Sequence, residues 1–171
     1  MKIKIKLFDG QVMPEIRQNG DWIDLRANKD IEIKGPFAHT LNGKRDKRDV
    51  VFNNELFGLG IAMELPRGYE AIALPRSGTY NKFMVCLANS QGVLDNSYRG
   101  DNDEWKFNAI AFKDTVIHKG DRICQFRIQL SQFATVWQKI KWLFWNGKIK
   151  FVQVEHLNNP ERGGFGSTGI N

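Results

Sequence analysis

Three glycine-containing segments, residues 74–78, 92–100 and 162–169, combine residue types that bind phosphate groups. Glycine lets backbone N–H groups approach an anion closely, and the arginine and serine side chains in these segments add further donors. Each segment alone is a weak signal. A Pro-Arg-Ser-Gly sequence also makes an ordinary turn, and a glycine-rich end is also typical of a disordered terminus. The P-loop pattern Gly-x-x-x-x-Gly-Lys-Ser/Thr is absent.

The order and spacing of these segments resemble the trimeric dUTP pyrophosphatase (dUTPase) family, whose members carry five short motifs in a fixed order. Residues 76–78 (Arg-Ser-Gly) match the second motif, residues 92–100 (Gly-Val-Leu-Asp-Asn-Ser-Tyr-Arg-Gly) the third, and residues 119–125 (Lys-Gly-Asp-Arg-Ile-Cys-Gln) the fourth. Residues 162–169 (Arg-Gly-Gly-Phe-Gly-Ser-Thr-Gly) match the fifth, and residues 24–27 (Asp-Leu-Arg-Ala) resemble the first more weakly. The resemblance therefore spans nearly the whole chain, and its order favours family membership over coincidence.

The resemblance implies the hydrolysis of dUTP to dUMP and pyrophosphate, which would limit uracil in DNA and supply dUMP for dTTP synthesis. Asp95 would be the general base that deprotonates the water attacking the α-phosphorus. Tyr98 would pack against the deoxyribose and exclude a 2′-hydroxyl. The uracil edge would be hydrogen-bonded by Asn89 and by the backbone of Gly92, Val93 and Leu94. The phosphates would be held by Arg76, Ser77, Gly78 and Gln125.

The same resemblance gives the glycine-rich end a function and implies a homotrimer whose active sites are shared between subunits. The end would close over the nucleotide, with Phe165 stacked on the uracil and Arg162 and Ser167 at the phosphates. Gly166 would belong to the same binding segment. Mg²⁺ would bind through the triphosphate of the substrate, with Asp24 near its water shell and no direct protein ligand.

Several features depart from the family pattern. Ser97 stands where a second acidic residue is common, so any ion pair made by that carboxylate is lost. The fifth motif has fewer residues between Arg162 and its Gly-Phe-Gly core, which leaves the reach of Arg162 open. Residues 35–54 and 132–150 are longer than the compact family pattern. Insertions of this kind are frequent in bacteriophage members, so a phage origin is one reading of the chain.

Short apolar runs separated by turn residues predict an all-β protein that positions these motifs. Lysine and aliphatic residues alternate over residues 1–8, as in a half-buried strand, and residues 35–54 are predicted to be a long exposed loop. Further strands are expected at residues 22–27, 31–33, 59–65, 69–74, 84–87, 107–112, 115–117, 122–130 and 149–154. The resemblance implies a dUTPase-like β-barrel or jelly roll (β-clip) over residues 1–157, followed by a flexible tail over residues 158–171.

One inserted helix is predicted within residues 132–146. Apolar residues fall there at helical spacing, with Lys139 and Lys141 among them. These apolar residues are Val136, Trp137, Ile140, Leu143 and Phe144. We expect the helix to pack on its own barrel. A membrane or a partner protein is the alternative for such a basic aromatic helix.

The composition fits a single cytoplasmic domain. At about 150 residues per domain, 171 residues make about one, and a 42% hydrophobic fraction excludes a disordered chain. No apolar run approaches the roughly 18 residues of a membrane-spanning helix. Two cysteines, Cys86 and Cys124, suit a reducing compartment, which would be the host cytoplasm if the chain is phage-encoded.

The charge and the scattered histidines leave the partner less defined. A net charge of +6 (25 basic minus 19 acidic residues) admits a nucleotide, a nucleic acid or another anionic surface. With the resemblance, dUTP is the expected partner, and neither nucleic acid nor a membrane is expected. The three histidines have no ligand spacing, so no metal cluster is predicted.

Two alternatives stay open. The related dCTP deaminase chemistry uses the same fold but needs a catalytic glutamate near the base, whereas Asp95 with Tyr98 favours dUTP hydrolysis. A regulatory role, in which the two insertions bind another protein, is compatible with catalysis.

Overall fold

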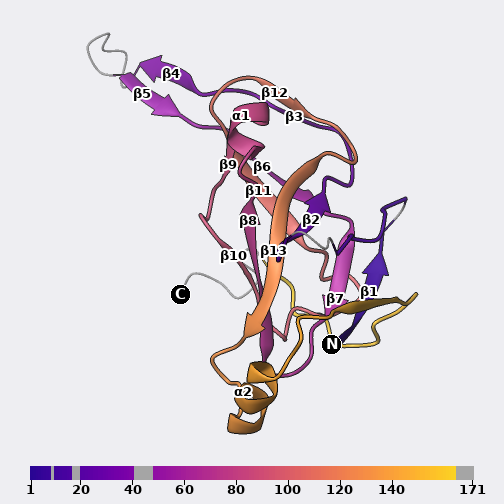
Figure 1. Cartoon of the computed structure of the whole chain (residues 1–171). Coiled ribbons are helices and arrows are strands. Elements are labelled where there is room, and N and C mark those ends of the chain that lie inside the picture. Colours follow the sequence, from indigo (N-terminus) through magenta and orange to yellow (C-terminus); the bar gives the residue numbers. More distant parts are fainter. Residues whose placement is uncertain (9, 17–19, 41–47, 165–171) are drawn as a thin grey trace.

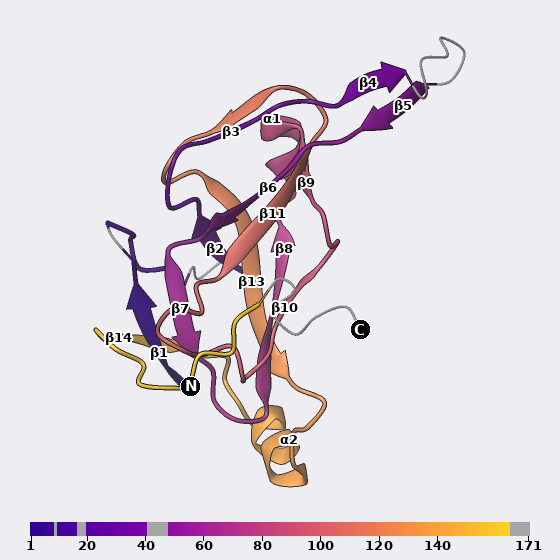
Figure 2. The same ribbon diagram turned by 180° about the vertical axis from the view of Figure 1, so that it is seen from behind.

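The computed structural model describes residues 1–8, 10–16, 20–40 and 48–164. In this part of the chain, fourteen short strands and two helices form an elongated body from which one β-hairpin projects (Figure 1). The hairpin and helix α2 (Val136–Leu143) lie at opposite ends of the molecule (Figure 2). The all-β fold class with a short inserted helix is confirmed. The strands form separate sheets of two to four strands, and no closed barrel is formed within the described ranges.

The largest sheet carries most of the predicted motifs. Its strand order is β10 (Gly92–Leu94), β8 (Tyr69–Pro75), β13 (Arg122–Leu130) and β2 (Ile23–Arg26), and all three pairings are antiparallel. Because β13 is the longest strand, it pairs with β8 along most of its length and with β2 at its start. Segments from the first, third and fourth motifs therefore meet in one sheet, and the second motif directly follows its strand β8.

The remaining strands complete the body. Strand β1 lies between β14, which is parallel to it, and β7, which is antiparallel. Strand β11 lies between β6 and β9, and β3 pairs with β12. The bounds of these strands are Lys2–Leu7 for β1, Lys150–Gln153 for β14, Ile61–Glu64 for β7, Asn54–Gly58 for β6, Lys106–Ala111 for β11, Val85–Leu87 for β9, Ile31–Ile33 for β3 and Thr115–Ile117 for β12.

The prediction of a long exposed loop at residues 35–54 is wrong. The segment contains two paired strands, β4 (Phe37–Thr40) and β5 (Arg48–Val51), which form the projecting hairpin. Phe37 lies opposite Val51, and His39 lies opposite Asp49. Apolar and β-branched residues at the two ends of the segment favour extended backbone, and the charged residues between them obscured this pattern in the sequence. The basic run of residues 44–48 lies almost wholly outside the described residues.

Helix α2 is confirmed, and it contacts the body as expected, but not through the apolar residues that predicted it. Thr135 caps its N-terminus in a reciprocal capping box with Gln138. The Gln138 side chain donates to the carbonyl of Arg67, and Trp142 packs on Tyr69 with ring centroids 5.8 Å apart. The side chains that predicted the helix point away from the body, with Trp137 73% and Leu143 79% exposed. Neither described helix is long and apolar enough to cross a membrane.

Aromatic side chains contribute much of the core. Trp105 and Phe126 are fully buried, and their rings meet edge to face at 5.1 Å between centroids. Phe57 and Phe107 pack beside each other at 5.7 Å. Phe57 and Phe107 belong to the paired strands β6 and β11, and Trp105 directly precedes β11, whereas Phe126 is on β13 of the largest sheet, so these contacts join the two sheets.

Replacing a core aromatic should therefore cost much of the stability. Phe126→Ala is expected to lower the free energy of unfolding by about 3–5 kcal/mol, because it removes a buried ring and leaves a cavity. Urea denaturation at one fixed protein concentration measures the change. Phe133→Ala is the matched control, because Phe133 is 87% exposed and its loss should cost no more than about 0.5 kcal/mol. Equal effects of the two substitutions would contradict this assignment of the core.

Candidate active site

The predicted site residues fall into two groups, one at a face of the largest sheet and the other around a pocket against the opposite face. Asp24 on β2 lies opposite Gln125 on β13, so both side chains point to the same face. The next pair, Leu25 and Cys124, points to the other face and is completely buried. We call the first face the outer face and the second the inner face. Among the described residues, no hydrogen bond or ion pair joins the two groups.

The outer group is organised around the Asp24 carboxylate. Its Oδ1 lies 2.7 Å from Nε of Arg76, and its Oδ2 lies 3.1 Å from Nη1 of Arg122. Gln125 lies beside Asp24 in the paired strands. One carboxylate thus holds two guanidinium groups together. The arrangement suits a ligand with several negative charges.

Thr79 fixes the turn that carries the second motif. Its buried hydroxyl donates to the carbonyl of Ile123 on β13 (2.7 Å) and accepts from the backbone N–H of Arg76 (3.0 Å). Ser77 and Gly78 are exposed in this turn, just before helix α1 (Thr79–Phe83). A Cβ added to Gly78 would meet nothing within 4 Å, so the turn is open to an incoming ligand.

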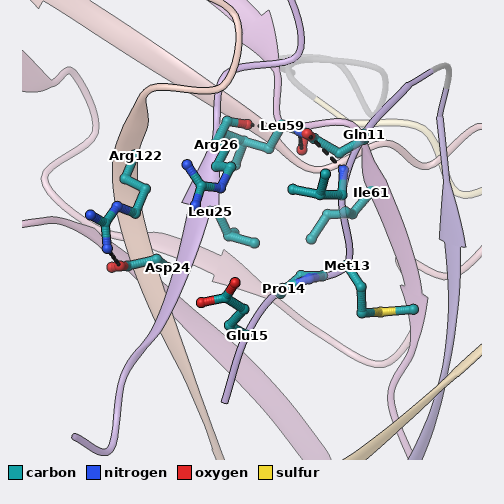
Figure 3. A pocket seen from close by; sticks show the side chains of 11 residues that line it. Gln11, Met13, Pro14, Glu15, Asp24, Leu25, Arg26, Leu59, Ile61 and Arg122 are labelled. Carbon is teal, nitrogen blue, oxygen red and sulfur yellow. Dashed lines mark hydrogen bonds and ion pairs between the residues drawn. The ribbon is translucent and has the colours of Figure 1, made fainter. Parts of the chain in front are cut away.

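A narrow pocket beside the outer group is too small for a nucleotide. It encloses about 20 Å³ and is bordered by Asp24 and Arg122 on one side and by Met13, Pro14 and Glu15 on the other (Figure 3). The Gln11 side chain closes it by donating to the carbonyl oxygens of Leu59 and Arg26. The volume suffices for about one water molecule.

A larger, mainly apolar pocket of about 250 Å³ lies on the inner face. This is just below the range of roughly 300–1,000 Å³ typical of small-molecule sites. Burial raises the pKa of the Cys124 thiol in its wall, so this side chain is a neutral, apolar surface. The remaining lining residues are Leu59, Ala73, Leu87, Asn89, Gly92, Val93, Leu94, Tyr98, Lys106, Phe107, Asn108, Arg162 and Gly164.

Tyr98 forms a fixed wall of this inner pocket. Its hydroxyl donates to the carbonyl of Glu104 (2.7 Å), and the side chain is largely buried. Burial, with the nearby Asp103 and Glu104 carboxylates, raises the pKa of Tyr98 to about 12. The phenol is therefore neutral and its ring orientation is set by the hydrogen bond.

Asp95 follows β10 and lies beside the inner pocket. Its Oδ1 accepts hydrogen bonds from the Ser97 backbone N–H (2.7 Å) and hydroxyl (2.5 Å). Its Oδ2 lies 3.5 Å from Nη2 of Arg162. Partial burial alone would raise the pKa of Asp95, but the Ser97 hydrogen bonds and the Arg162 charge outweigh it, so the pKa is lowered. Asp95 is therefore ionised at neutral pH, and Oδ2 is its less occupied oxygen.

The beginning of the predicted tail lies against this site. Arg162 reaches Asp95, and a Cβ added to Gly164 would lie 3.3 Å from the Tyr98 ring. Both residues also line the inner pocket. The other tail residues of the prediction, Phe165, Gly166 and Ser167, lie outside the described residues.

The structure therefore brings one part of the predicted site residues together at the inner pocket and places the other part at the outer group. The following residues meet at the inner pocket or beside it: Asn89, Gly92, Val93, Leu94, Asp95, Tyr98 and Arg162. Arg76 and Gln125 lie with Asp24 at the outer group. Sequence reasoning missed the site contacts of Arg122 and Ser97. The arginine inside the fourth motif was the available signal for Arg122, whereas the hydroxyl of Ser97 gave none.

In the described ranges, no three His, Cys, Asp or Glu side chains come close enough together to hold a metal ion. Both oxygens of Asp24 already contact an arginine. This donor set fits a cation that arrives already coordinated by the ligand's own oxygens and water.

Comparison with known sequences agrees with the resemblance that the motifs gave. The family model described as dUTPase matches residues 49–169. The SPbeta prophage-derived deoxyuridine 5'-triphosphate nucleotidohydrolase of Bacillus subtilis strain 168 is 45% identical over 170 residues, which cover 99% of each chain. The deoxyuridine 5'-triphosphate nucleotidohydrolase of Helicobacter pylori strain P12 is 31% identical over 174 residues, covering 99% of this chain and 98% of the relative.

Solved structures share the fold at lower identity. A dUTPase from Streptococcus mutans superposes with a TM-score of 0.61 at 17% identity, covering 77% of this chain and 98% of that chain. A mutant dUTPase from phage phi11 of Staphylococcus aureus, described with a structural Mg(II) ion, gives 0.59 at 15% identity, covering 78% and 94%. At these identities the comparison supports the jelly-roll type of fold and nothing further.

Proposed function

The chain belongs to the dUTPase family, and from that premise we propose that it hydrolyses dUTP to dUMP and pyrophosphate. The observation that carries the proposal is an ionised carboxylate, Asp95, beside an inner pocket walled by Tyr98 and Asn89. A relative named for this activity is 45% identical over 99% of the chain. The cytoplasm, that of a host if the chain is phage-encoded, remains the expected location.

The inner pocket is proposed to take the nucleoside. Asn89 and the backbone of Gly92, Val93 and Leu94 offer donors and acceptors for the uracil edge. A base with the wrong edge would leave these groups unpaired, which is a costly mismatch. The neutral Tyr98 ring, held through its hydroxyl, would pack against the deoxyribose and leave no room for a 2′-hydroxyl.

Asp95 is proposed to act as the general base. Ser97 occupies Oδ1, so Oδ2 is the oxygen that would accept the proton from water. The water oxygen then bonds to the α-phosphorus while the bond from that phosphorus to the bridging oxygen breaks, and pyrophosphate leaves. Arg162, 3.5 Å from Oδ2, lies where it could bind a phosphate oxygen once substrate is present.

The outer group is proposed to bind the phosphates at the site of a neighbouring subunit. Gln125 lies on the face opposite the inner pocket, Arg76 is paired with Asp24 there, and Ser77 and Gly78 follow in the same turn, so one chain does not assemble both halves. Pairing the outer face of one subunit with the inner pocket of another would join the two halves of the site. This is the arrangement expected of a homotrimer with shared sites.

Magnesium is proposed to enter with the substrate. An ion carried by the triphosphate would neutralise part of its charge and needs few protein ligands. Asp24 lies at the outer group, where it could contact water around such an ion, but its oxygens are paired with Arg76 and Arg122.

A protein-binding role is a second proposed function, and the exposed surface of α2 favours it. Phe133, Trp137, Leu143 and Phe144 are each more than 70% exposed. Residues 131–154 contain four lysines and no acidic residue. A neighbouring structure, the dUTPase of Staphylococcus bacteriophage 80alpha, is described as controlling transfer of virulence genes. A partner protein suited to this surface would have an apolar groove with carboxylates along its rim, and α2 would bind in that groove.

The activity is tested by giving the purified protein dUTP, dCTP, dTTP and UTP with Mg²⁺ and assaying both pyrophosphate and ammonia. We expect pyrophosphate from dUTP and none from dCTP, dTTP or UTP. Ammonia from dCTP would instead indicate deaminase chemistry, and no pyrophosphate from dUTP would overturn the proposal.

Ser97→Ala should move the acid limb of the pH–rate profile to higher pH. Turnover requires ionised Asp95, so it is present above the pKa of that carboxyl and lost as the pH falls through it. Removing the Ser97 hydroxyl removes a hydrogen bond that lowers this pKa, so the pKa rises. Steady-state kinetics between pH 4 and 8 measure the limb.

Ser97→Thr retains a hydroxyl and is the matched control for this shift. Its acid limb should stay near that of the unmodified protein. Coincident profiles for the unmodified protein and Ser97→Ala would exclude a role of the hydroxyl in holding Asp95 ionised.

A further inference from the structure

Asp103 is a buried carboxylate whose hydrogen-bond donors come from two distant parts of the chain. Only 2% of the residue is exposed. Its Oδ2 accepts from the backbone N–H groups of Gly100 (2.8 Å) and Arg162 (3.0 Å), and its Oδ1 accepts from that of Gly163 (3.0 Å). We propose that Asp103 is a positioning residue that holds Arg162 beside Asp95. The effect on catalysis rests on the proposed dUTP hydrolysis, whereas the anchoring contact does not.

The energetics of burial favour this anchor. A buried carboxylate is costly unless its oxygens accept hydrogen bonds. Two of the three donors to Asp103 belong to residues 162 and 163, so the carboxylate would retain only the Gly100 N–H without that segment. Docking of the segment therefore satisfies the carboxylate and fixes the backbone from which the Arg162 side chain extends.

The neighbours of Asp103 bind the preceding residues of the same segment. Asp101 accepts from the backbone N–H groups of Leu157 (2.8 Å) and Asn158 (3.3 Å). The backbone N–H of Asn102 donates to the Glu161 carboxylate at 3.0 Å. Leu157 is itself buried. Three successive loop residues thus bind the segment, and Asp103 contacts the part nearest the site.

Gly100 allows the close approach on which the anchor depends. A Cβ at this position would lie 2.8 Å from Cα and 2.5 Å from Oε2 of Glu161. Gly100→Ala should therefore displace the segment while leaving the Asp103 carboxylate in place. Asp103→Asn and Gly100→Ala are therefore two independent substitutions that should displace Arg162 from its position beside Asp95.

A double-mutant cycle tests whether Asp103 acts through Arg162. Asp103→Asn keeps the shape of the side chain but replaces one accepting oxygen with a donor. It should lower kcat/KM for dUTP roughly tenfold or more, because the misplaced guanidinium no longer binds phosphate. In an Arg162→Ala background, Asp103→Asn should cause little further loss, since the group that it positions is already absent. Gly100→Ala should show the same non-additivity.

The control is Asp114→Asn, because Asp114 also accepts a backbone N–H, from Gly35 at 2.8 Å, in a loop outside the site. The kcat/KM of Asp114→Asn for dUTP should equal that of the unmodified protein. Losses that multiply in the double variant, or full activity of Asp103→Asn, would overturn the positioning role.

Hydrogen exchange of the unmodified protein tests whether Asp103 anchors residues 162 and 163. This measurement needs neither catalytic activity nor a variant that folds correctly. The amides of Arg162 and Gly163 should exchange more slowly than in an unstructured peptide, because both donate to a buried acceptor. Exchange at the rate of a free peptide would overturn the proposal even if dUTP is hydrolysed. Protected amides in a protein that does not turn over dUTP would instead reject the proposed function and leave the anchor intact.

Discussion

Asp95→Asn is expected to lower kcat for dUTP by roughly 10²- to 10⁴-fold, the usual cost of losing a general base. The amide oxygen of asparagine can still accept from the Ser97 N–H and hydroxyl, so the loop should keep its conformation. The other position becomes an NH₂ group, which cannot take a proton from water. Steady-state pyrophosphate release measures the loss.

Binding separates this chemical role from a binding role. The Kd of a non-hydrolysable imido analogue of dUTP should change little in Asp95→Asn, because the pocket walls are intact. Asp30→Asn is the matched control, since Asp30 also accepts a backbone N–H, from Lys119 at 2.7 Å, in an exposed loop. A near-normal rate for Asp95→Asn would remove Asp95 as the base.

Mixing two inactive variants is expected to restore activity if the site is shared between subunits. Arg76→Ala should lose roughly 10²-fold or more in kcat/KM, because it removes a charge-assisted phosphate contact from the outer group. Asp95→Asn removes the base from the inner pocket. Because Arg76 is paired with Asp24 at the outer group whereas Asp95 lies beside the inner pocket, a neighbouring pair of chains can supply one intact residue each. Random assembly of equal amounts gives roughly one intact site in four.

The experiment needs co-expression of the two variants with different affinity tags, so that mixed assemblies are isolated. Each variant expressed with both tags and purified in the same way is the control, and it should remain inactive. A mixed assembly no more active than its better parent would show that the outer group and the inner pocket do not complete one site across subunits.

Strand and helix positions followed from local patterns wherever the pattern was regular. The lysine and aliphatic alternation of residues 2–7 predicted β1, and helical spacing predicted α2. The hairpin at β4 and β5 was missed because charged residues interrupt its apolar pattern. The side of α2 that meets the body could not be predicted from the sequence. Periodicity defines an apolar side, but contacts of Gln138 and Trp142 decide which side meets the body.

The site shows the same division between residue type and position. Glycine, arginine, serine and aspartate in ordered segments indicated phosphate chemistry, because those side chains and the open backbone are what such ligands require. Their grouping depends on pleat parity and on strand register, which bring Asp24 beside Gln125 and turn both away from Cys124. Neither property is visible in the spacing of short motifs.

The sequence by itself determined the fold class and the family and indicated candidate residues for the chemistry, because each depends on residue type and order along the chain. Only the tertiary structure decided that these residues form two groups on opposite faces, that Ser97 occupies one oxygen of Asp95, and that Asp103 anchors Arg162. These facts depend on close contacts and strand register. Asp103 and Arg162 are 59 residues apart, and folding brings their atoms to 3.0 Å.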